Sequence, residues 1–241
     1  KESRSKFFYV GPMFRGERPQ KGRLRQFHQI GAEVIGPGTT TPFLDAEMIE
    51  LAVHLLTESG VKALTVKINS LGTPEDKKNF SAVLRRALEP FTKELCEDCQ
   101  ARLHRNVFRV LDCKKKTCQA VVDRIPLKYD HLSPESRDYF DKVKDALRMR
   151  GVAFVEDPRL VRGLDYYTHT VFEISSSSLG SQDALGAGGR YNNLVQELGG
   201  NAVDAVGFAL GMERIILATE GEKAKEPAGL NAFIVPLGEP A

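Results

Sequence analysis

Residues 14–33, FRGERPQKGRLRQFHQIGAE, constrain the fold of this chain more than any other stretch. The segment on their N-terminal side, 6–14, is rich in aromatic and β-branched residues, and residues 27–35 alternate, so each is expected to form a strand. The loop that joins them is polar and contains a proline and a glycine, which predicts a hairpin. Arginines gathered on such a hairpin indicate that an anionic ligand binds there.

One face of the second strand has the composition of a binding surface. Residues two apart in a strand share a face, so this face combines an aromatic ring, an amide, a glycine and a carboxylate, supplied by Phe27, Gln29, Gly31 and Glu33. Arg15 lies at the end of the first strand, where its planar guanidinium suits bidentate recognition of phosphate. The alternative is a solvated, arginine-rich hairpin that binds nothing.

The composition of the chain is typical of a globular protein. It has 241 residues, of which 41% are hydrophobic and 27% charged, enough for one large domain or two smaller ones. The formal net charge is only +2, so any basic surface must be local. No apolar run reaches the length of a membrane span, and the N-terminal residues lack a signal-peptide pattern. We therefore expect a soluble, cytoplasmic protein without a membrane partner.

The middle of the chain combines a packing helix, a strand and a long helical region. Thr41 is suited to cap a helix that begins at Pro42 and stops at Gly60, and residues 63–71 alternate like a strand. Residues 74–156 carry amphipathic patterns dense in lysine and arginine, which predicts an inserted helical module between two halves of a sheet. The basic helices would suit nucleic-acid phosphates, although an exposed pair of charged helices has the same pattern.

All four cysteines of the chain lie in this predicted module. Cys96 and Cys99 form a CxxC pair, and Cys113 and Cys118 form a CxxxxC pair. Four thiolates suit a closed tetrahedral zinc site of structural type. The second pair is wider than a usual zinc knuckle and the segment between the pairs lacks glycines, so four reduced thiols without a metal are the alternative.

Further candidate site residues follow the module. Arg162 precedes a strand rich in β-branched and aromatic residues, and Tyr167 projects from that strand, although a core tyrosine would give the same pattern. The glycines of residues 184–190, ALGAGGR, let the backbone approach a ligand closely, and Tyr191 follows them directly. Arg214 lies near the start of a final helix, where the helix N-terminus favours phosphate.

Several of these segments resemble a known family. Residues 14–34 resemble the second signature motif of class II aminoacyl-tRNA synthetases, and in detail that of histidyl-tRNA synthetases. RGLDYYTHTVFE, 162–173, is similar to a segment peculiar to histidyl-tRNA synthetases, and AVGFALGMERIIL, 205–217, resembles the third class II motif. The resemblance implies an α+β fold, in which helices flank an antiparallel sheet that carries an inserted, mainly helical domain.

The resemblance also implies an activity, histidine–tRNA ligase, and a role for each matching residue. The enzyme would activate L-histidine with ATP and Mg²⁺ to histidyl-adenylate and pass the histidyl group to tRNA(His), as a homodimer. Arg15 and Arg162 would be catalytic. ATP would be bound by Arg15, Glu17, Phe27 and Arg214; histidine by Gln29, Glu33, Arg162, Tyr167 and Tyr191; and tRNA by Arg18, Gln20 and Arg23.

The same resemblance divides the chain into four parts. Residues 1–73 and 157–228 would form the catalytic core, residues 74–156 the inserted domain, and residues 229–241 the start of an anticodon-binding domain. The first class II motif is absent, so the activity is expected of the full-length protein and not necessarily of this piece alone. Two other functions compete: a histidine-binding regulatory subunit of ATP phosphoribosyltransferase, and a synthetase-like binding module of a stress-sensing kinase. The intact arginine-bearing motifs favour the synthetase.

Overall fold

The fold is built on one seven-stranded sheet in the order β1-β2-β7-β6-β5-β3-β4. The computed structural model describes residues 4–16, 19, 24–163, 165–179 and 183–219. Within these ranges the strands are β1 (Ser5–Phe14), β2 (Gln26–Ile35), β3 (Leu64–Ser70), β4 (Val155–Glu156), β5 (Thr168–Ser176), β6 (Ala184–Arg190) and β7 (Ala205–Gly211). All neighbouring strands are antiparallel except β3 and β4, which confirms the predicted α+β class with an antiparallel sheet.

The predicted hairpin forms one side of this sheet. Strands β1 and β2 pair from Ser5 opposite Ile35 to Phe14 opposite Gln26, and Arg15 N–H donates to the carbonyl of Arg25 at 2.9 Å just beyond the strands. The next neighbour of β2 is β7, which lies near the end of the described chain. The hairpin is thereby held against the segment that carries Arg214.

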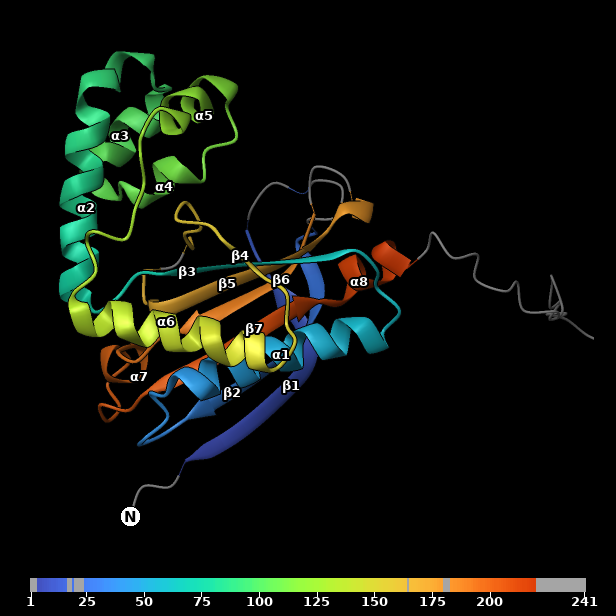
Figure 1. Cartoon of the computed structure of the whole chain (residues 1–241). Coiled ribbons are helices and arrows are strands. Elements are labelled where there is room, and N and C mark those ends of the chain that lie inside the picture. The colour runs from blue at the N-terminus through green and yellow to red at the C-terminus, as the bar shows by residue number, and fades with distance from the viewer. Residues whose placement is uncertain (1–3, 17–18, 20–23, 164, 180–182, 220–241) are drawn as a thin grey trace, which may run out of the picture.

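Two helices, α1 (Pro42–Glu58) and α6 (Pro134–Met149), cover one face of the sheet (Figure 1). Thr41 caps α1 as predicted, since its hydroxyl accepts the N–H of Leu44 at 3.2 Å and Pro42 occupies the first turn. Apolar side chains from both helices and from the sheet share one hydrophobic core, including Ile49, Leu147 and Phe172. Each such side chain contributes about 1.5–3 kcal/mol on burial, which explains why these helices lie on this face.

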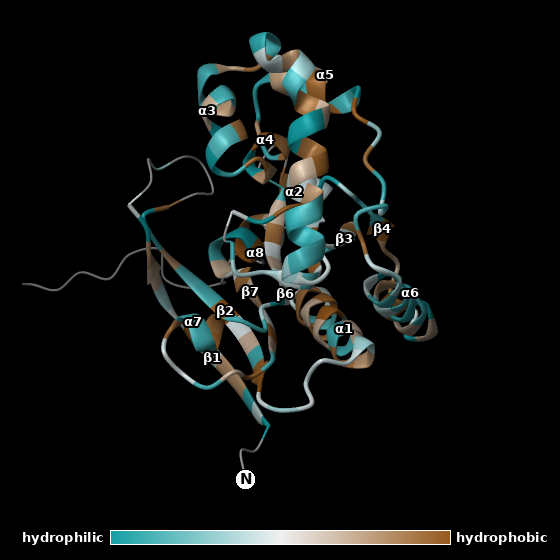
Figure 2. Ribbon diagram, turned by 90° about the vertical axis from the view of Figure 1, so that its left-hand side faces the viewer, coloured by the Kyte–Doolittle hydropathy of each residue, from teal (hydrophilic) through white to brown (hydrophobic). Residues whose placement is uncertain are grey.

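A separate hydrophobic cluster holds the basic helical region together (Figure 2). It is formed by α2 (Pro74–Leu88), the 3-10 helix η1 (Glu89–Glu94), α3 (Glu97–Arg105), α4 (Phe108–Leu111) and α5 (Lys116–Asp123). Its core residues run from Phe80 to Ile125, whereas the apolar residues of α6 belong to the core beneath the sheet. Residues 229–241 lie outside the described ranges, and the division of the chain into domains stays a prediction.

The carboxylate of Asp76 joins the two connections between this helical cluster and the sheet. It accepts the N–H of Thr73 at 2.8 Å at the entry into α2, and the N–H of Ser133 at 2.8 Å and the hydroxyl of Ser136 at 2.5 Å at the start of α6. Burial would raise the pKa of Asp76, but these hydrogen bonds outweigh it and hold the pKa below its usual value. A charged Asp76 therefore fixes where both connections leave the sheet.

Short elements complete the fold: η2 (Ser177–Leu179), α7 (Leu194–Glu197) and α8 (Met212–Thr219). α8 follows β7 directly, so its first turn lies beside the hairpin. Among the helices that the structure describes, none combines the length and the apolar composition needed to cross a bilayer.

Candidate active site

A cavity of about 490 Å³ opens on the sheet face that α1 and α6 leave uncovered. Side chains of β2 alternate between the two faces of the sheet. Ile30 and Val34 pack into the core with α1, whereas Gln29 and Glu33 line the cavity on the opposite face. Every predicted ATP- or histidine-binding residue that the structure describes lines this cavity, namely Arg15, Phe27, Gln29, Glu33, Arg162, Tyr167, Tyr191 and Arg214. Segments far apart in the sequence therefore meet at one place.

Four predicted residues of the hairpin loop lie outside the described residues. They are Glu17, assigned to ATP by the resemblance, and Arg18, Gln20 and Arg23, assigned to tRNA. Their roles stay predictions.

Glu33 is the central carboxylate of the cavity. The hydroxyl of Tyr191 donates a hydrogen bond to Glu33 Oε2. Burial raises the pKa of Glu33, and the Tyr191 hydrogen bond opposes that rise. Room for the carboxylate exists because position 207 is glycine, since a Cβ there would lie only 1.5 Å from Oε2. Tyr9 lies close by, and its own burial together with the charge of Glu33 raises the pKa of Tyr9 to about 12.

Three tyrosines form an aromatic wall beside Glu33. The ring centroids of Tyr166 and Tyr167 are 4.6 Å apart, and Tyr191 stands at 88° to Tyr167 with a centroid distance of 6.5 Å. Burial raises the pKa of Tyr167 and of Tyr191, so both hydroxyls stay protonated and able to donate hydrogen bonds at neutral pH. The carboxylate can accept a hydrogen bond and the phenol hydroxyls can donate one. This pairing suits a small planar ring that carries both an N–H group and an unprotonated nitrogen.

Arg162 points a guanidinium into the same cavity. Its Nη1 donates to Glu173 Oε2 at 2.9 Å. Its Nε is buried and has no hydrogen-bond partner among the residues that the structure describes. The Arg162 side chain as a whole is 27% exposed and lines the cavity, so an anionic ligand there can reach the guanidinium group. Glu173 holds the other side of the guanidinium and so restricts its orientation.

Two more arginines border the cavity. Arg15 Cζ lies 4.2 Å from the centroid of the Phe27 ring, and Arg15 Nε donates to the carbonyl of Leu24 at 2.6 Å. Arg214, in the first turn of α8, donates through Nη1 to the carbonyl of Ala184. The guanidinium groups come from three different segments, which concentrates positive charge around one space.

α8 is fastened to the hairpin by its glutamate. Glu213 accepts the backbone N–H of His28 at 2.9 Å and meets His28 Nδ1 at 2.9 Å. Burial would raise the pKa of Glu213, but the His28 hydrogen bonds outweigh it and lower the pKa. This contact fixes the first turn of α8, and with it Arg214, beside strand β2.

A second cleft of about 680 Å³ lies between the helical cluster and the sheet. It shares Glu173 and Arg214 with the first cavity and adds Lys67, Lys114 and Arg159. The two spaces therefore adjoin, and the cations that border the second are matched by as many carboxylates, those of Asp112, Asp157, Glu173 and Asp183.

Sequence reasoning missed several lining residues. Tyr9 and Glu173 line the cavity but were not predicted, and the need for glycine at position 207 was not recognised. Tyr9 could have been found from the strand period, because it lies on the face of Arg15 and pairs with Gly31. A lone carboxylate between Phe172 and Ile174 in strand β5 was a comparable signal for Glu173.

The four cysteines are brought together inside the helical cluster. The Sγ atoms of Cys96, Cys99, Cys113 and Cys118 all lie within 4.8 Å of one another, and none forms a disulfide. Tetrahedral zinc with Zn–S bonds of ~2.3 Å needs sulfur atoms roughly 3.8 Å apart, so a small contraction suffices. The backbone N–H of Cys96 already donates to Cys118 Sγ at 3.3 Å. A hydrogen bond from the backbone N–H of Cys99 is the main cause that lowers the pKa of Cys96 to about 7. This set of donors fits a thiophilic divalent metal such as zinc.

Comparison with known proteins agrees with this geometry. The profile of the family described as Histidyl-tRNA synthetase matches residues 1–215. A curated relative named histidine–tRNA ligase, from Halothermothrix orenii, is 45% identical over 239 residues, which cover 98% of this chain and 57% of the relative. The crystal structure of an apo histidyl-tRNA synthetase from S. aureus matches with a TM-score of 0.69 and 38% identity, covering 97% of this chain and 56% of that one.

A more distant likeness concerns the fold alone. The structure named an ATP phosphoribosyltransferase regulatory subunit/histidyl-tRNA synthetase, from Bacillus halodurans C, has a TM-score of 0.61 but only 23% identity, covering 89% of this chain and 58% of that one. The chain spans a little over half the length of the curated relative from H. orenii. Because the family profile matches nearly all of the described chain, from the hairpin to the first turn of α8, the chain belongs to the histidyl-tRNA synthetase family.

Proposed function

We propose that this protein is the core of a histidine–tRNA ligase, which activates L-histidine with ATP and transfers it to tRNA(His). The observation that carries this proposal is the convergence of Arg15, Arg162 and Arg214 on one cavity that also contains the Glu33–Tyr191 pair. Three guanidinium groups suit a triphosphate, and a paired carboxylate and phenol suit an imidazole. Neither feature alone would select this reaction.

Adenylate formation needs positioning and charge stabilisation more than covalent chemistry by the protein. The carboxylate of histidine attacks the α-phosphate of ATP in line, the new O–P bond forms, and the bond to the departing pyrophosphate breaks. Arg162 is suited to hold the carboxylate and the α-phosphate together, because it lines the cavity and Glu173 fixes the orientation of its guanidinium. Arg15 would contact the α-phosphate and Arg214 the γ-phosphate. Glu17 would assist ATP binding, and Mg²⁺ would neutralise the polyphosphate.

Adenine would stack on Phe27. One face of this ring is covered by the Arg15 guanidinium at 4.2 Å. A cation over an aromatic ring contributes about 0.5–1 kcal/mol at an exposed site, which is small beside the attraction of a guanidinium to a phosphate. Binding of ATP would therefore draw Arg15 off the ring towards the α-phosphate and uncover the stacking surface.

The side chain of histidine would be read by Glu33 and Tyr167. A neutral imidazole has one N–H donor and one nitrogen acceptor, so a carboxylate and a phenol can each satisfy one nitrogen. Tyr191 would hold Glu33 in place, and Gln29 would bind the amine. A side chain without matching groups would leave a buried carboxylate unpaired, and this is a strong basis for discrimination.

The tRNA would approach over the helical module. The loop residues Arg18, Gln20 and Arg23 would contact its acceptor end, and Lys114 and Arg159 beside the second cleft would exchange their partners Asp112 and Asp123 for phosphates. We assign the chain to the cytoplasm as a homodimer on the basis of the family. The four cysteines would hold a structural zinc ion that braces the module, outside the chemistry of the reaction.

Histidine-dependent pyrophosphate exchange by the full-length protein that contains this chain tests the proposal, and the variants below are made in that protein. Arg162→Ala should lower the exchange rate about 10²–10³-fold, the usual effect of removing one transition-state donor. Arg148→Ala is the matched control, because this arginine pairs with Asp145 on the exposed side of α6. Normal exchange by Arg162→Ala would overturn the catalytic assignment. Histidine binding without any exchange by the full-length wild-type protein would instead support a regulatory subunit.

A further inference from the structure

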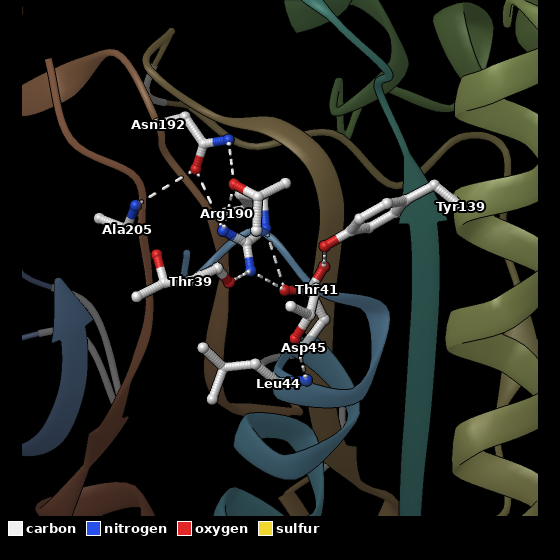
Figure 3. Close-up of polar contacts among 9 residues, drawn as sticks. Thr39, Thr41, Leu44, Asp45, Tyr139, Arg190, Asn192 and Ala205 are labelled. Carbon is white, nitrogen blue, oxygen red and sulfur yellow. Dashed lines mark hydrogen bonds and ion pairs between the residues drawn. The ribbon is translucent and has the colours of Figure 1, made fainter. Parts of the chain in front are cut away.

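A buried ion pair lies directly behind the histidine-binding tyrosine. Arg190 is fully buried, with 0% of its surface exposed, and Asp45 is 1% exposed (Figure 3). Burial alone would lower the pKa of Arg190, but the charge of Asp45 outweighs it and raises the pKa, so the guanidinium stays charged. Neither residue lines the cavity.

All five N–H groups of Arg190 are used. Nε donates to Asp45 Oδ1 at 3.0 Å, and Nη2 donates to the same atom and to the carbonyl of Thr39 at 2.7 Å. Nη1 donates to Thr40 Oγ1 at 3.3 Å and to Asn192 Oδ1 at 3.1 Å. Only an arginine can satisfy so many acceptors in one plane, so the site specifies this residue at the end of β6.

The network joins elements that are distant in sequence. Asp45 belongs to the first turn of α1 and also accepts the hydroxyl of Tyr139, from α6, at 3.1 Å. Asn192 accepts the N–H of Ala205, the first residue of β7, at 3.2 Å (Figure 3). Arg190 thus ties the end of β6 to both covering helices and to the neighbouring strand.

Such a network is better suited to fixing a position than to adding stability. Burying an ion pair costs so much desolvation that apolar replacements are often equally stable. Strand β6, ALGAGGR, offers three glycines and two alanines, so little side-chain packing exists to locate its end. Backbone pairing with β5 and β7 sets the register of that end, and Arg190 supplies its side-chain anchor.

The residue that benefits is Tyr191. Its backbone N–H donates to the carbonyl of Ala205 at 2.9 Å, between the two anchors at Arg190 and Asn192, and its hydroxyl reaches Glu33 on the cavity side. Since neighbouring residues of an extended chain point to opposite faces, Arg190 points to the helices while Tyr191 points to the cavity. The position of the Arg190 side chain therefore influences how close the Tyr191 hydroxyl comes to Glu33.

We infer that Arg190, held by Asp45, is a positioning residue that sets Tyr191 against Glu33 and thereby tunes selection of histidine. The inference rests on the proposed function, in which Glu33 reads the imidazole. A purely structural role would weaken folding and lower activity towards both substrates. A positioning role raises the KM for histidine and leaves the KM for ATP unchanged.

Arg190→Lys tests this, because it keeps the charge and loses the planar fork. We expect the KM for histidine in pyrophosphate exchange to rise about tenfold, equivalent to the loss of one hydrogen bond to a charged group, with the KM for ATP within about twofold of wild type. In the Tyr191→Phe background, Arg190→Lys should add less than about twofold, because both changes act on the same contact.

Milder variants keep the test valid if Arg190→Lys folds poorly. Tyr139→Phe removes only the hydroxyl that steadies Asp45 and should raise the KM for histidine about threefold. Tyr129→Phe is its matched control, because the buried Tyr129 hydroxyl has no hydrogen-bond partner among the described residues. This control should leave the KM for histidine unchanged.

Two results would overturn the inference. One is an equal rise in both KM values in Arg190→Lys and Tyr139→Phe; the other is full additivity of Arg190→Lys with Tyr191→Phe. A crystal structure of Arg190→Lys supplies a test that needs no activity, since the Tyr191 hydroxyl should leave hydrogen-bonding distance of Glu33. If that contact persists, the inference is wrong, whereas failure of the wild-type protein to exchange pyrophosphate would count against the proposed function alone.

Discussion

Replacing Gly207 with alanine should damage the Glu33 site and spare the end of the cavity at which we propose that ATP binds. A Cβ at this position would lie 1.5 Å from Oε2 and 2.3 Å from Cδ of Glu33, and 2.7 Å from the carbonyl oxygen of Ala32. The carboxylate would have to move by about 1.5 Å to restore a contact of 3.0 Å. Such a movement breaks the hydrogen bond from Tyr191.

The expected energies follow from these contacts. Losing a hydrogen bond to a charged group costs about 1.5–3 kcal/mol, and the crowding against Ala32 costs about 1–3 kcal/mol of folding free energy. The first figure corresponds to a rise of roughly 10–100-fold in the KM for histidine. Phe27 lies six residues from Glu33 along β2, about 20 Å away, so the KM for ATP should change less than about twofold.

The assay is pyrophosphate exchange, combined with urea unfolding. Gly11→Ala is the matched control, because a Cβ on Gly11 would meet no atom within 4 Å. This control should leave both KM values unchanged and raise the free energy of unfolding slightly, by about 0.5–1 kcal/mol. A histidine KM in Gly207→Ala within about twofold of the Gly11→Ala value would refute the assignment of Glu33 to the substrate.

Two further predictions concern the helical module. Asp76→Asn should destabilise the protein by about 1–3 kcal/mol at neutral pH. Hydrogen bonds lower the pKa of Asp76 in the folded protein, so the stability that its charge contributes is complete above the unfolded pKa of about 3.9. This stability is lost as the pH falls through the pKa of Asp76 in the folded protein. Urea midpoints of both proteins should therefore converge below about pH 4, and a constant difference down to pH 2 would exclude this origin. The purified protein should contain about one equivalent of zinc, measured by atomic emission, and Cys118→Ser should lose it; four thiols that react freely in the native metal-free protein would contradict the site.

Local patterns in the sequence were sufficient for the hairpin, for α1 and for one face of the site, but not for strand β6, whose glycine-rich sequence was interpreted as a loop. Alternation in β2 separates Glu33 from Val34, because successive side chains of a strand must point to opposite faces. The cap at Thr41 and the proline after it locate the start of α1, since both act on backbone groups within one turn. The spacing of the cysteines suggested a metal site but left four unliganded thiols as the alternative.

Tertiary structure alone decided which distant residues meet. Tyr191 and Glu33 are 158 residues apart, and Arg190 and Asp45 are 145 apart. The strand order places β7 between β2 and β6, and that order depends on the summed packing of the whole core and not on any local period. The need for glycine at position 207 has the same origin, because the atom that would clash belongs to another strand. The sequence alone therefore determined which residues share a face of a strand. The distances between functional groups depended on the assembly of the whole sheet.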